Sequence, residues 1–149
     1  MNVGQVCNRE VIIVNQDASI LKACQLMRQH HVGSLLIVDE QEGRRYPVGI
    51  ITDRDIVVEL LAEELPLDRI SIGDAMSFEL LTATENDDLL FTIKRMRTKG
   101  VRRAPVIASD GTLVGLLAVD DIIELLTEQL TDLVALIANE RSHERNRRS

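Results

Sequence analysis

The feature that most constrains this chain of 149 residues is an internal repeat. When the sequence is shifted by 69 positions, residues of one kind coincide: Ile20 with Leu89, Cys24 with Ile93, Met27 with Met96, Arg28 with Arg97 and Val32 with Val101. From Gly49 onward the shift becomes 66, because a turn in the first copy is three residues longer. Insertions are tolerated in turns, so the chain is predicted to contain two copies of one structural unit.

Each copy shows the same predicted order of elements: strand, helix, strand, strand, helix. In the first copy we expect strands at 11–14, 35–38 and 48–51, and in the second at 80–81, 106–107 and 113–117. Apolar residues at helical spacing follow the first strand of each copy. Asp17 and Asp87 are the expected caps of these helices, and the second helices start near Asp53 and Asp120. A short helix is expected around 74–76.

The repeat predicts an α/β fold made of two β-α-β-β-α units. A single unit would leave one face of its three-stranded sheet bare, whereas two units can cover each other. We therefore expect a pseudo-two-fold module with clefts between the copies, followed by an extended C-terminal helix. The expected boundaries are 8–66 for the first domain, 67–78 for a linker, 79–128 for the second domain and 129–149 for a helical tail.

The composition argues against nucleic acid and membranes as partners. Aromatic residues make up 2% of the chain and the net charge is −7. Few rings are available to stack on bases, and the charge repels phosphate backbones and anionic lipids. No apolar run is long enough to cross a bilayer, and the N-terminus lacks a signal pattern. With two cysteines and no Cys-x-x-Cys motif, a cytoplasmic location is expected.

The segment 49–55 combines the residue types that a sugar-binding site needs. Gly49 allows another chain or a ligand to approach the backbone closely, and Thr52 offers a hydroxyl where the strand ends. Asp55 falls in the first turn of the next helix, where its carboxylate could accept both hydrogen bonds of a ribose diol. The alternative is that Thr52 and Asp53 only cap the helix. Inside a duplicated unit the binding interpretation is favoured.

Together these features resemble a tandem pair of CBS domains, often called a Bateman module. The resemblance rests on Gly49, Thr52 and Asp55 and on the segments 32–39 and 100–107, and it covers about residues 8–127. It implies a regulatory ligand such as AMP, ADP, ATP, NAD or S-adenosylmethionine, and no other cofactor. The predicted ligand contacts in the first copy are Gly49, Ile51, Thr52, Asp55, Ile12, Ile13, Ser34 and Leu35, with Thr52 and Asp55 on the ribose.

The second copy departs from this pattern. Ala118 stands where the first copy has a hydroxyl residue, although Asp121 is kept. A second cleft built around Asp121 is therefore expected to be weaker or empty. Arg102 and Arg103 begin the central strand of this copy and could face a ligand phosphate, for which arginine is well suited. The equal alternative is that they are solvated or form ion pairs.

Metal binding and catalysis find little support in the sequence. His30 and His31 have no third ligand at a suitable spacing. The repeat places His30 on Lys99, a cation at a helix end, and His31 on Gly100, a left-handed cap position. The sequence contains none of the common nucleophile, phosphate-loop or zinc-protease motifs. We therefore expect no metal site and no enzymatic activity.

The tail carries a coiled-coil pattern. Leu126, Leu130, Leu133 and Ile137 follow the 4-3-4 spacing of a short seam, which predicts a homodimer; the alternative is that they pack on the chain's own core. The favoured function is a sensor that binds an adenosine nucleotide and acts on a separate effector protein of unknown identity. One alternative is a ligand-free interaction module that recruits a partner through the tail. An enzyme is the third alternative.

Overall fold

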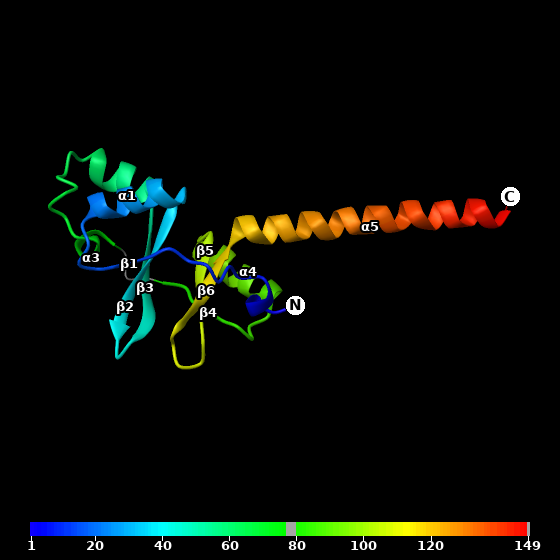
Figure 1. The fold of residues 1–149 in the computed structure, drawn as a ribbon, viewed down its shortest axis with the longest axis horizontal. Helices are drawn as coiled ribbons and strands as arrows, with labels where there is room; N and C mark the ends of the chain where they lie inside the picture. The colour runs from blue at the N-terminus through cyan, green and yellow to red at the C-terminus, as the bar shows by residue number, and fades with distance from the viewer. Residues whose placement is uncertain (77–79, 149) are drawn as a thin grey trace.

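The computed structural model describes residues 1–76 and 80–148. Each copy of the repeat forms its own three-stranded sheet with the same strand order (Figure 1). In both sheets the first strand runs parallel to the central strand, and the third strand is antiparallel to it. The strands are β1 (Ile13–Asn15), β2 (Ser34–Gln41), β3 (Arg44–Thr52), β4 (Ala83–Thr84), β5 (Arg103–Ile107) and β6 (Leu113–Ala118). The predicted α/β fold of two repeated units is confirmed.

The first strand of each copy lies later in the chain than predicted. The strand expected at 80–81 is found at Ala83–Thr84, and the strand expected at 11–14 is found at Ile13–Asn15. The apolar residues before each strand were mistaken for the strand itself. Val11, Ile12, Leu80 and Leu81 line the clefts between the copies instead, which accounts for their apolar character.

Two helices of equal length follow these strands, α1 (Ile20–His30) and α4 (Leu89–Lys99). Their caps are Ser19 and Asp88, so the prediction of Asp17 and Asp87 was wrong. Asp87 instead accepts hydrogen bonds from the backbone N–H and the hydroxyl of Thr84, at 2.9 and 2.7 Å. These bonds hold the pKa of the Asp87 carboxyl below its ordinary value.

Both helices end in the left-handed conformation that the repeat predicted. The residue after α1 is His31, with φ of 55°, and the residue after α4 is Gly100, with φ of 74°. In each case the backbone N–H of this residue donates to a carbonyl of the last helical turn. The equivalence of His31 with Gly100 is therefore confirmed, and it accounts for His31 as a helix end.

The second helices of the two copies differ greatly in length. In the first copy a single turn, α2 (Asp53–Asp55), continues as a π-helical segment, η2 (Ile56–Leu61). In the second copy α5 (Val119–Arg148) runs for 30 residues and projects away from the rest of the molecule (Figure 1). The predicted extended C-terminal helix is confirmed. Within the described residues, neither α5 nor another helix is long and apolar enough to cross a membrane.

The two copies exchange the segments that precede them. The 3-10 turn η1 (Val3–Gln5) comes before the first copy, yet Val3 is fully buried in the core of the second. The short helix α3 (Ile72–Ala75) comes before the second copy, yet Ile72 is fully buried in the core of the first. The backbone N–H of Ile72 donates to the carbonyl of Ala18 at 2.8 Å, which ties α3 to the first copy. The predicted linker at 67–78 is thus largely a packed part of the fold, and the predicted boundary between 78 and 79 lies outside the described residues.

Gly115 permits the close contact that holds the N-terminal segment on the second sheet. Asn8 and Leu116 exchange backbone hydrogen bonds, each 2.9 Å long. A Cβ atom at position 115 would lie 2.5 Å from the carbonyl oxygen of Asn8, so Gly115→Ala would force the two backbones apart.

We expect Gly115→Ala to lower the free energy of unfolding by roughly 1–3 kcal/mol, as overpacking does. Urea denaturation of wild type and variant would measure the change. Gly33→Ala is the control, because its Cβ would meet only the end of the Asp53 side chain, at 3.2 Å, and this side chain can move. Equal stability of the two variants would contradict the account.

Candidate functional site

Two clefts lie between the copies, and the repeat relates one to the other. The first, here called the Thr52 cleft, has a volume of about 690 Å³. Its walls are the end of β3 and the start of α2 from the first copy, with residues 80–81 and 99–103 of the second. Small-molecule sites usually measure roughly 300–1,000 Å³, so this cleft is large enough for a nucleotide.

The second, here called the Asp121 cleft, has a volume of about 220 Å³. Its walls are the end of β6 and the start of α5 from the second copy, with residues 10–12 and 32–34 of the first. Each segment is the repeat equivalent of a segment in the Thr52 cleft. The two clefts are therefore alike in backbone arrangement and differ in side chains and in size.

Thr52 and Asp55 form a reciprocal cap at the start of α2. The Thr52 hydroxyl accepts a hydrogen bond from the backbone N–H of Asp55 at 3.1 Å, and Asp55 Oδ2 accepts one from the backbone N–H of Thr52 at 3.1 Å. The capping interpretation is thus correct for Thr52. Asp53 Oδ1 accepts a hydrogen bond from the neighbouring Arg54 N–H at 2.8 Å, and the N-cap of α2 is Thr52 rather than Asp53.

The cap leaves part of Asp55 available to a ligand. Asp55 is exposed and lines the Thr52 cleft. Within residues 1–76 and 80–148, no hydrogen bond is recorded to its second oxygen, Oδ1. The cap therefore fixes the orientation of the carboxylate and keeps one charged acceptor free. Capping and ligand binding do not exclude each other at this residue.

Four basic residues line the Thr52 cleft: Arg54, Lys99, Arg102 and Arg103. Arg102 lies 3.4 Å from Asp120, but both side chains are more than 70% exposed, so the pair contributes little. Arg103 is half-buried and lies beside it at the start of β5. The sequence left two interpretations of this pair: contact with a ligand phosphate, or solvated or ion-paired side chains. The second interpretation describes Arg102.

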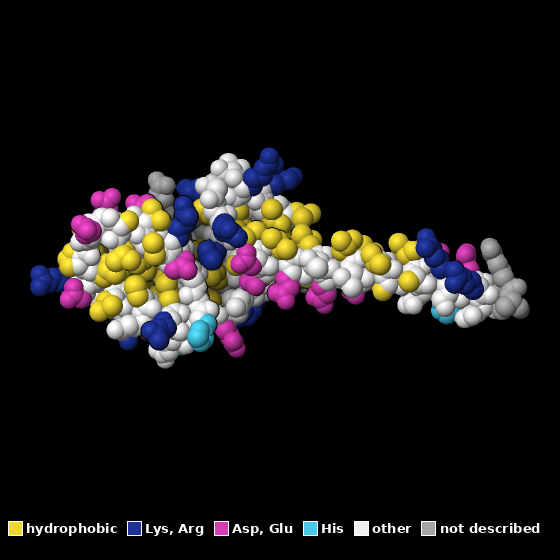
Figure 2. All heavy atoms as spheres, turned by 90° about the horizontal axis from the view of Figure 1, so that it is seen from above, with side chains coloured by type: hydrophobic (Ala, Val, Ile, Leu, Met, Phe, Trp, Pro, Cys, Tyr) yellow, Lys and Arg dark blue, Asp and Glu magenta, His cyan; other side chains and the backbone are white. Residues whose placement is uncertain are grey.

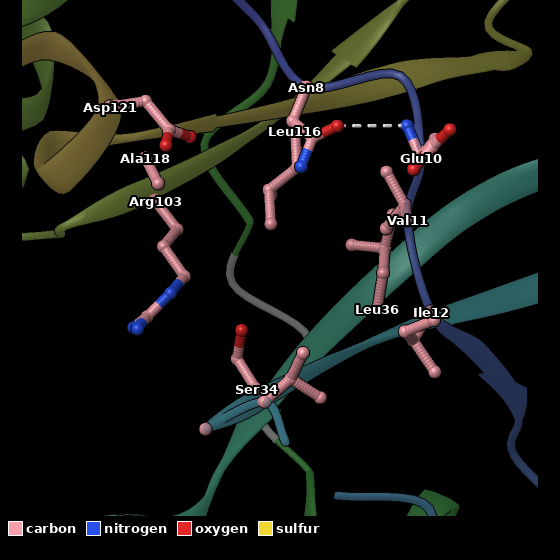
Figure 3. A pocket seen from close by; sticks show the side chains of 12 residues that line it. Asn8, Glu10, Val11, Ile12, Ser34, Leu36, Arg103, Leu116, Ala118 and Asp121 are labelled. Atoms are coloured by element: carbon pink, nitrogen blue, oxygen red, sulfur yellow. Dashed lines mark hydrogen bonds between the residues drawn. The ribbon is translucent and has the colours of Figure 1, made fainter. Parts of the chain in front are cut away.

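The Asp121 cleft (Figure 3) is lined by one basic residue, Arg103, whereas four basic residues line the Thr52 cleft. Ala118 and Asp121 come from the second copy, and Ser34 faces them from the first. Without a hydroxyl at position 118, the cap seen at Thr52 cannot form. The backbone N–H of Glu10 donates to Asn8 Oδ1 at 3.0 Å and fixes the edge of the cleft.

The structure divides the predicted ligand residues between the two clefts. Thr52, Asp55, Arg102 and Arg103 line the Thr52 cleft, whereas Ile12, Ser34, Arg103 and Asp121 line the other. The remaining predicted contacts, Ile13, Leu35, Gly49 and Ile51, line neither; Leu35 and Ile51 lie in the core of the first copy.

The apolar wall of the Thr52 cleft comes from residues that were not predicted: Ile50, Leu80, Leu81 and Val101. A signal for one of them existed, because the shift of 69 places Leu81 on Ile12, which is a predicted contact. The described residues contain no group of three or more His, Cys, Asp or Glu placed to hold a metal ion.

Comparison with known proteins gives a consistent picture. The family profile of the CBS domain matches residues 3–62 and 72–128. An uncharacterized protein of Methanopyrus kandleri is 32% identical over 125 residues, which are 84% of this chain and 62% of that protein. The chain therefore spans less than two thirds of that relative. Hypoxic response protein 1 of Mycobacterium tuberculosis is 31% identical over 128 residues, 86% of this chain and 82% of that protein.

Solved structures show the same relationship. The CBS domain pair of protein MJ0100, in complex with 5′-methylthioadenosine and S-adenosyl-L-methionine, superposes with a TM-score of 0.75 at 26% identity. The match covers 87% of this chain and 98% of that one. Two successive profile matches, on two copies of one fold, leave a single assignment: the chain belongs to the CBS domain family and carries a tandem pair of CBS domains.

Proposed function

We propose that this CBS pair is a regulatory sensor that binds an adenosine-containing nucleotide in the Thr52 cleft. The observation that carries the proposal is the free Oδ1 of Asp55, held by the cap beside a cluster of cations in a cleft of about 690 Å³. A diol acceptor next to basic groups is what a ribose phosphate requires. The similarity to a CBS pair solved with two adenosine derivatives supports the same ligand class.

The cleft suggests how each part of the ligand binds. The ribose hydroxyls donate to Asp55 Oδ1 and lie near the Thr52 hydroxyl. The adenine packs on Leu80 and Leu81, and the phosphates reach Arg102 and Arg103. Because four basic residues line the cleft, phosphorylated ligands such as AMP, ADP, ATP or NAD are favoured over S-adenosylmethionine, whose sulfonium is cationic.

The Asp121 cleft is proposed to bind the same ligands less tightly. It is smaller, and Ala118 cannot supply the hydrogen bond that Thr52 offers. A neutral hydrogen bond contributes about 0.5–1.5 kcal/mol, or roughly two- to twelve-fold in affinity. We therefore infer one tight site at Thr52 and Asp55 and a weaker or empty one at Asp121.

The regulated target is proposed to be a separate protein. Membership of the CBS domain family supports a regulatory, ligand-binding role over a catalytic one. A cytoplasmic location fits the two free cysteines, Cys7 and Cys24. The second candidate function is an interaction module without a ligand, and the apolar face of α5 favours it: Leu126, Leu130, Leu133 and Ile137 are 51–63% exposed.

A thermal-shift screen with AMP, ADP, ATP, NAD and S-adenosylmethionine tests the proposal. A ligand at 100 times its dissociation constant stabilises the folded protein by about 2.7 kcal/mol, which raises the melting temperature of a chain of this size by roughly 5–11 °C. We expect the phosphorylated ligands to give the larger shifts. If none of the five shifts the melting temperature at millimolar concentration, the sensor is ruled out and the interaction module is favoured.

A further inference from the structure

Arg103 lies on the wall that the two clefts share. It is the first residue of β5, where it pairs with Ala118 of β6, and its half-buried side chain lines both clefts. Figure 3 shows this side chain extending into the open space between Asp121 and Ser34. Among the described residues, Arg103 is the only one that lines both clefts.

The guanidinium of Arg103 has no ion pair or hydrogen-bond partner in the described part of the chain. Its neighbour Arg102 pairs with Asp120, and Arg95 pairs with Asp87 at 3.7 Å. Partial burial removes water from a cation and costs free energy unless an anion replaces the water. The planar set of donors on arginine fits a phosphate in particular. An anionic ligand is therefore the partner that Arg103 lacks.

The repeat is broken at this position. Ser34 is the equivalent of Arg103: it is the first residue of β2 and pairs with Thr52 of β3. Its side chain is short and neutral, and it lines only the Asp121 cleft. The symmetric positions thus supply one guanidinium for two clefts, where a strict repeat would supply two or none.

We propose that Arg103 is a phosphate anchor that both clefts share, so that a phosphorylated nucleoside bound in one cleft weakens binding of a second one in the other. This rests on the proposed function. When a phosphate in the Thr52 cleft engages Arg103, the charged groups left in the Asp121 cleft are the carboxylates of Glu10 and Asp121, which repel a second phosphate. A neutral nucleoside does not need Arg103, so it fills the two clefts independently.

Calorimetric titration of the full chain with ADP and with adenosine tests the shared anchor. The shared anchor requires two binding events for each ligand, the weaker of them in the Asp121 cleft. For each ligand we take the dissociation constant of the weaker event divided by that of the tighter event. This ratio should be at least about tenfold larger for ADP than for adenosine, because only ADP loses a charge-assisted hydrogen bond at the second event.

Three variants assign the effect to Arg103. Arg103→Gln should weaken the tighter ADP event about tenfold or more, change adenosine binding far less than ADP binding, and remove the difference between the two ratios. Ser34→Arg supplies a guanidinium at the equivalent position and should bring the ADP ratio down to the adenosine ratio. Ser34→Gln is the matched control: it adds a long side chain without charge and should leave the ADP ratio high. Melting temperatures verify that each variant is folded.

The outcomes separate this inference from the proposed function. If the ratios for ADP and adenosine are equal in the wild type, or if Arg103→Gln leaves ADP affinity unchanged, the shared anchor is wrong while nucleotide binding stands. A stoichiometry of one adenosine per chain in the titration also overturns the shared anchor. If a folded wild-type protein binds neither ligand, the inference and the proposed function both fall.

Discussion

Replacing Asp55 by alanine is expected to weaken binding of the adenosine nucleotide by roughly 12- to 140-fold while the protein stays folded. The reason is the loss of a charged hydrogen-bond acceptor for the ribose diol, which contributes about 1.5–3 kcal/mol. Asp55 is exposed, and it exchanges two hydrogen bonds with the backbone N–H and the hydroxyl of Thr52. The alanine variant loses the hydrogen bond from the Thr52 N–H to the carboxylate. It keeps the hydrogen bond from the backbone N–H of residue 55 to the Thr52 hydroxyl. Titration calorimetry measures the affinity, and a melting curve measures the cost to the fold.

Two controls make this measurement specific. Asp121→Ala removes the equivalent carboxylate from the other cleft and should leave the tighter binding event unchanged. Asp55→Asn retains an oxygen that can accept from the Thr52 N–H, so it separates the loss of the charge from the loss of the cap. If Asp121→Ala abolishes the tighter event and Asp55→Ala does not, the two clefts have been assigned the wrong way round.

The architecture was predictable because the sequence contains two copies of the same structural unit. Apolar residues at matching positions, such as Met27 and Met96, mark the same helix face in both copies, and both are buried. A single copy would have left strand and helix assignments ambiguous, since short apolar runs fit either. Two copies that agree remove most of that ambiguity. The long tail helix was equally clear, because the apolar stripe after Asp121 continues well past the end of its counterpart in the first copy.

Local capping was harder to predict because several residues could perform it. Asp17, Ser19, Asp87 and Asp88 are all of residue types that favour helix N-caps. Which one is used depends on where the chain leaves the first strand, and the sequence placed that strand two or three residues too early. The predicted caps and the predicted first strands were thus wrong for the same reason, namely that each strand was placed too early in the chain.

The division of the site between the copies could not be predicted from either copy alone. The resemblance to the family drew the apolar contacts from the same copy as Thr52 and Asp55. In the structure each cleft is built by the β3 or β6 end of one copy and by the residues before the first strand and the central strand of the other. The exchange of η1 and α3 was missed for the same reason. Contacts between copies depend on how the two sheets face each other, and periodicity within a strand carries no information on that.

The full chain is expected to be a homodimer held by α5, and a double substitution in its apolar face is expected to make it monomeric. Figure 2 shows apolar side chains along one edge of α5 and acidic side chains along the opposite edge. Leu126, Leu130, Leu133 and Ile137 are 51–63% exposed although they follow the spacing of a coiled-coil seam. The alternative, that they pack on the chain's own core, does not occur in the structure. A second α5 would cover this face with side chains of the same kind.

Leu130→Glu combined with Leu133→Glu should abolish the dimer. Each buried leucine contributes roughly 1.5–3 kcal/mol, and the double variant removes four of them from a symmetric pair, which raises the dissociation constant by more than about 10⁴-fold. Thr131→Glu with Ala135→Glu is the matched control, because it adds the same two charges to the opposite face of the same exposed helix and should remain dimeric. Sedimentation at micromolar concentration distinguishes the monomeric leucine variant from the dimeric control. A chain ending at Glu128 should also sediment as a monomer. A monomeric wild type, or a control that dissociates as readily, would contradict a dimer held by this face of α5.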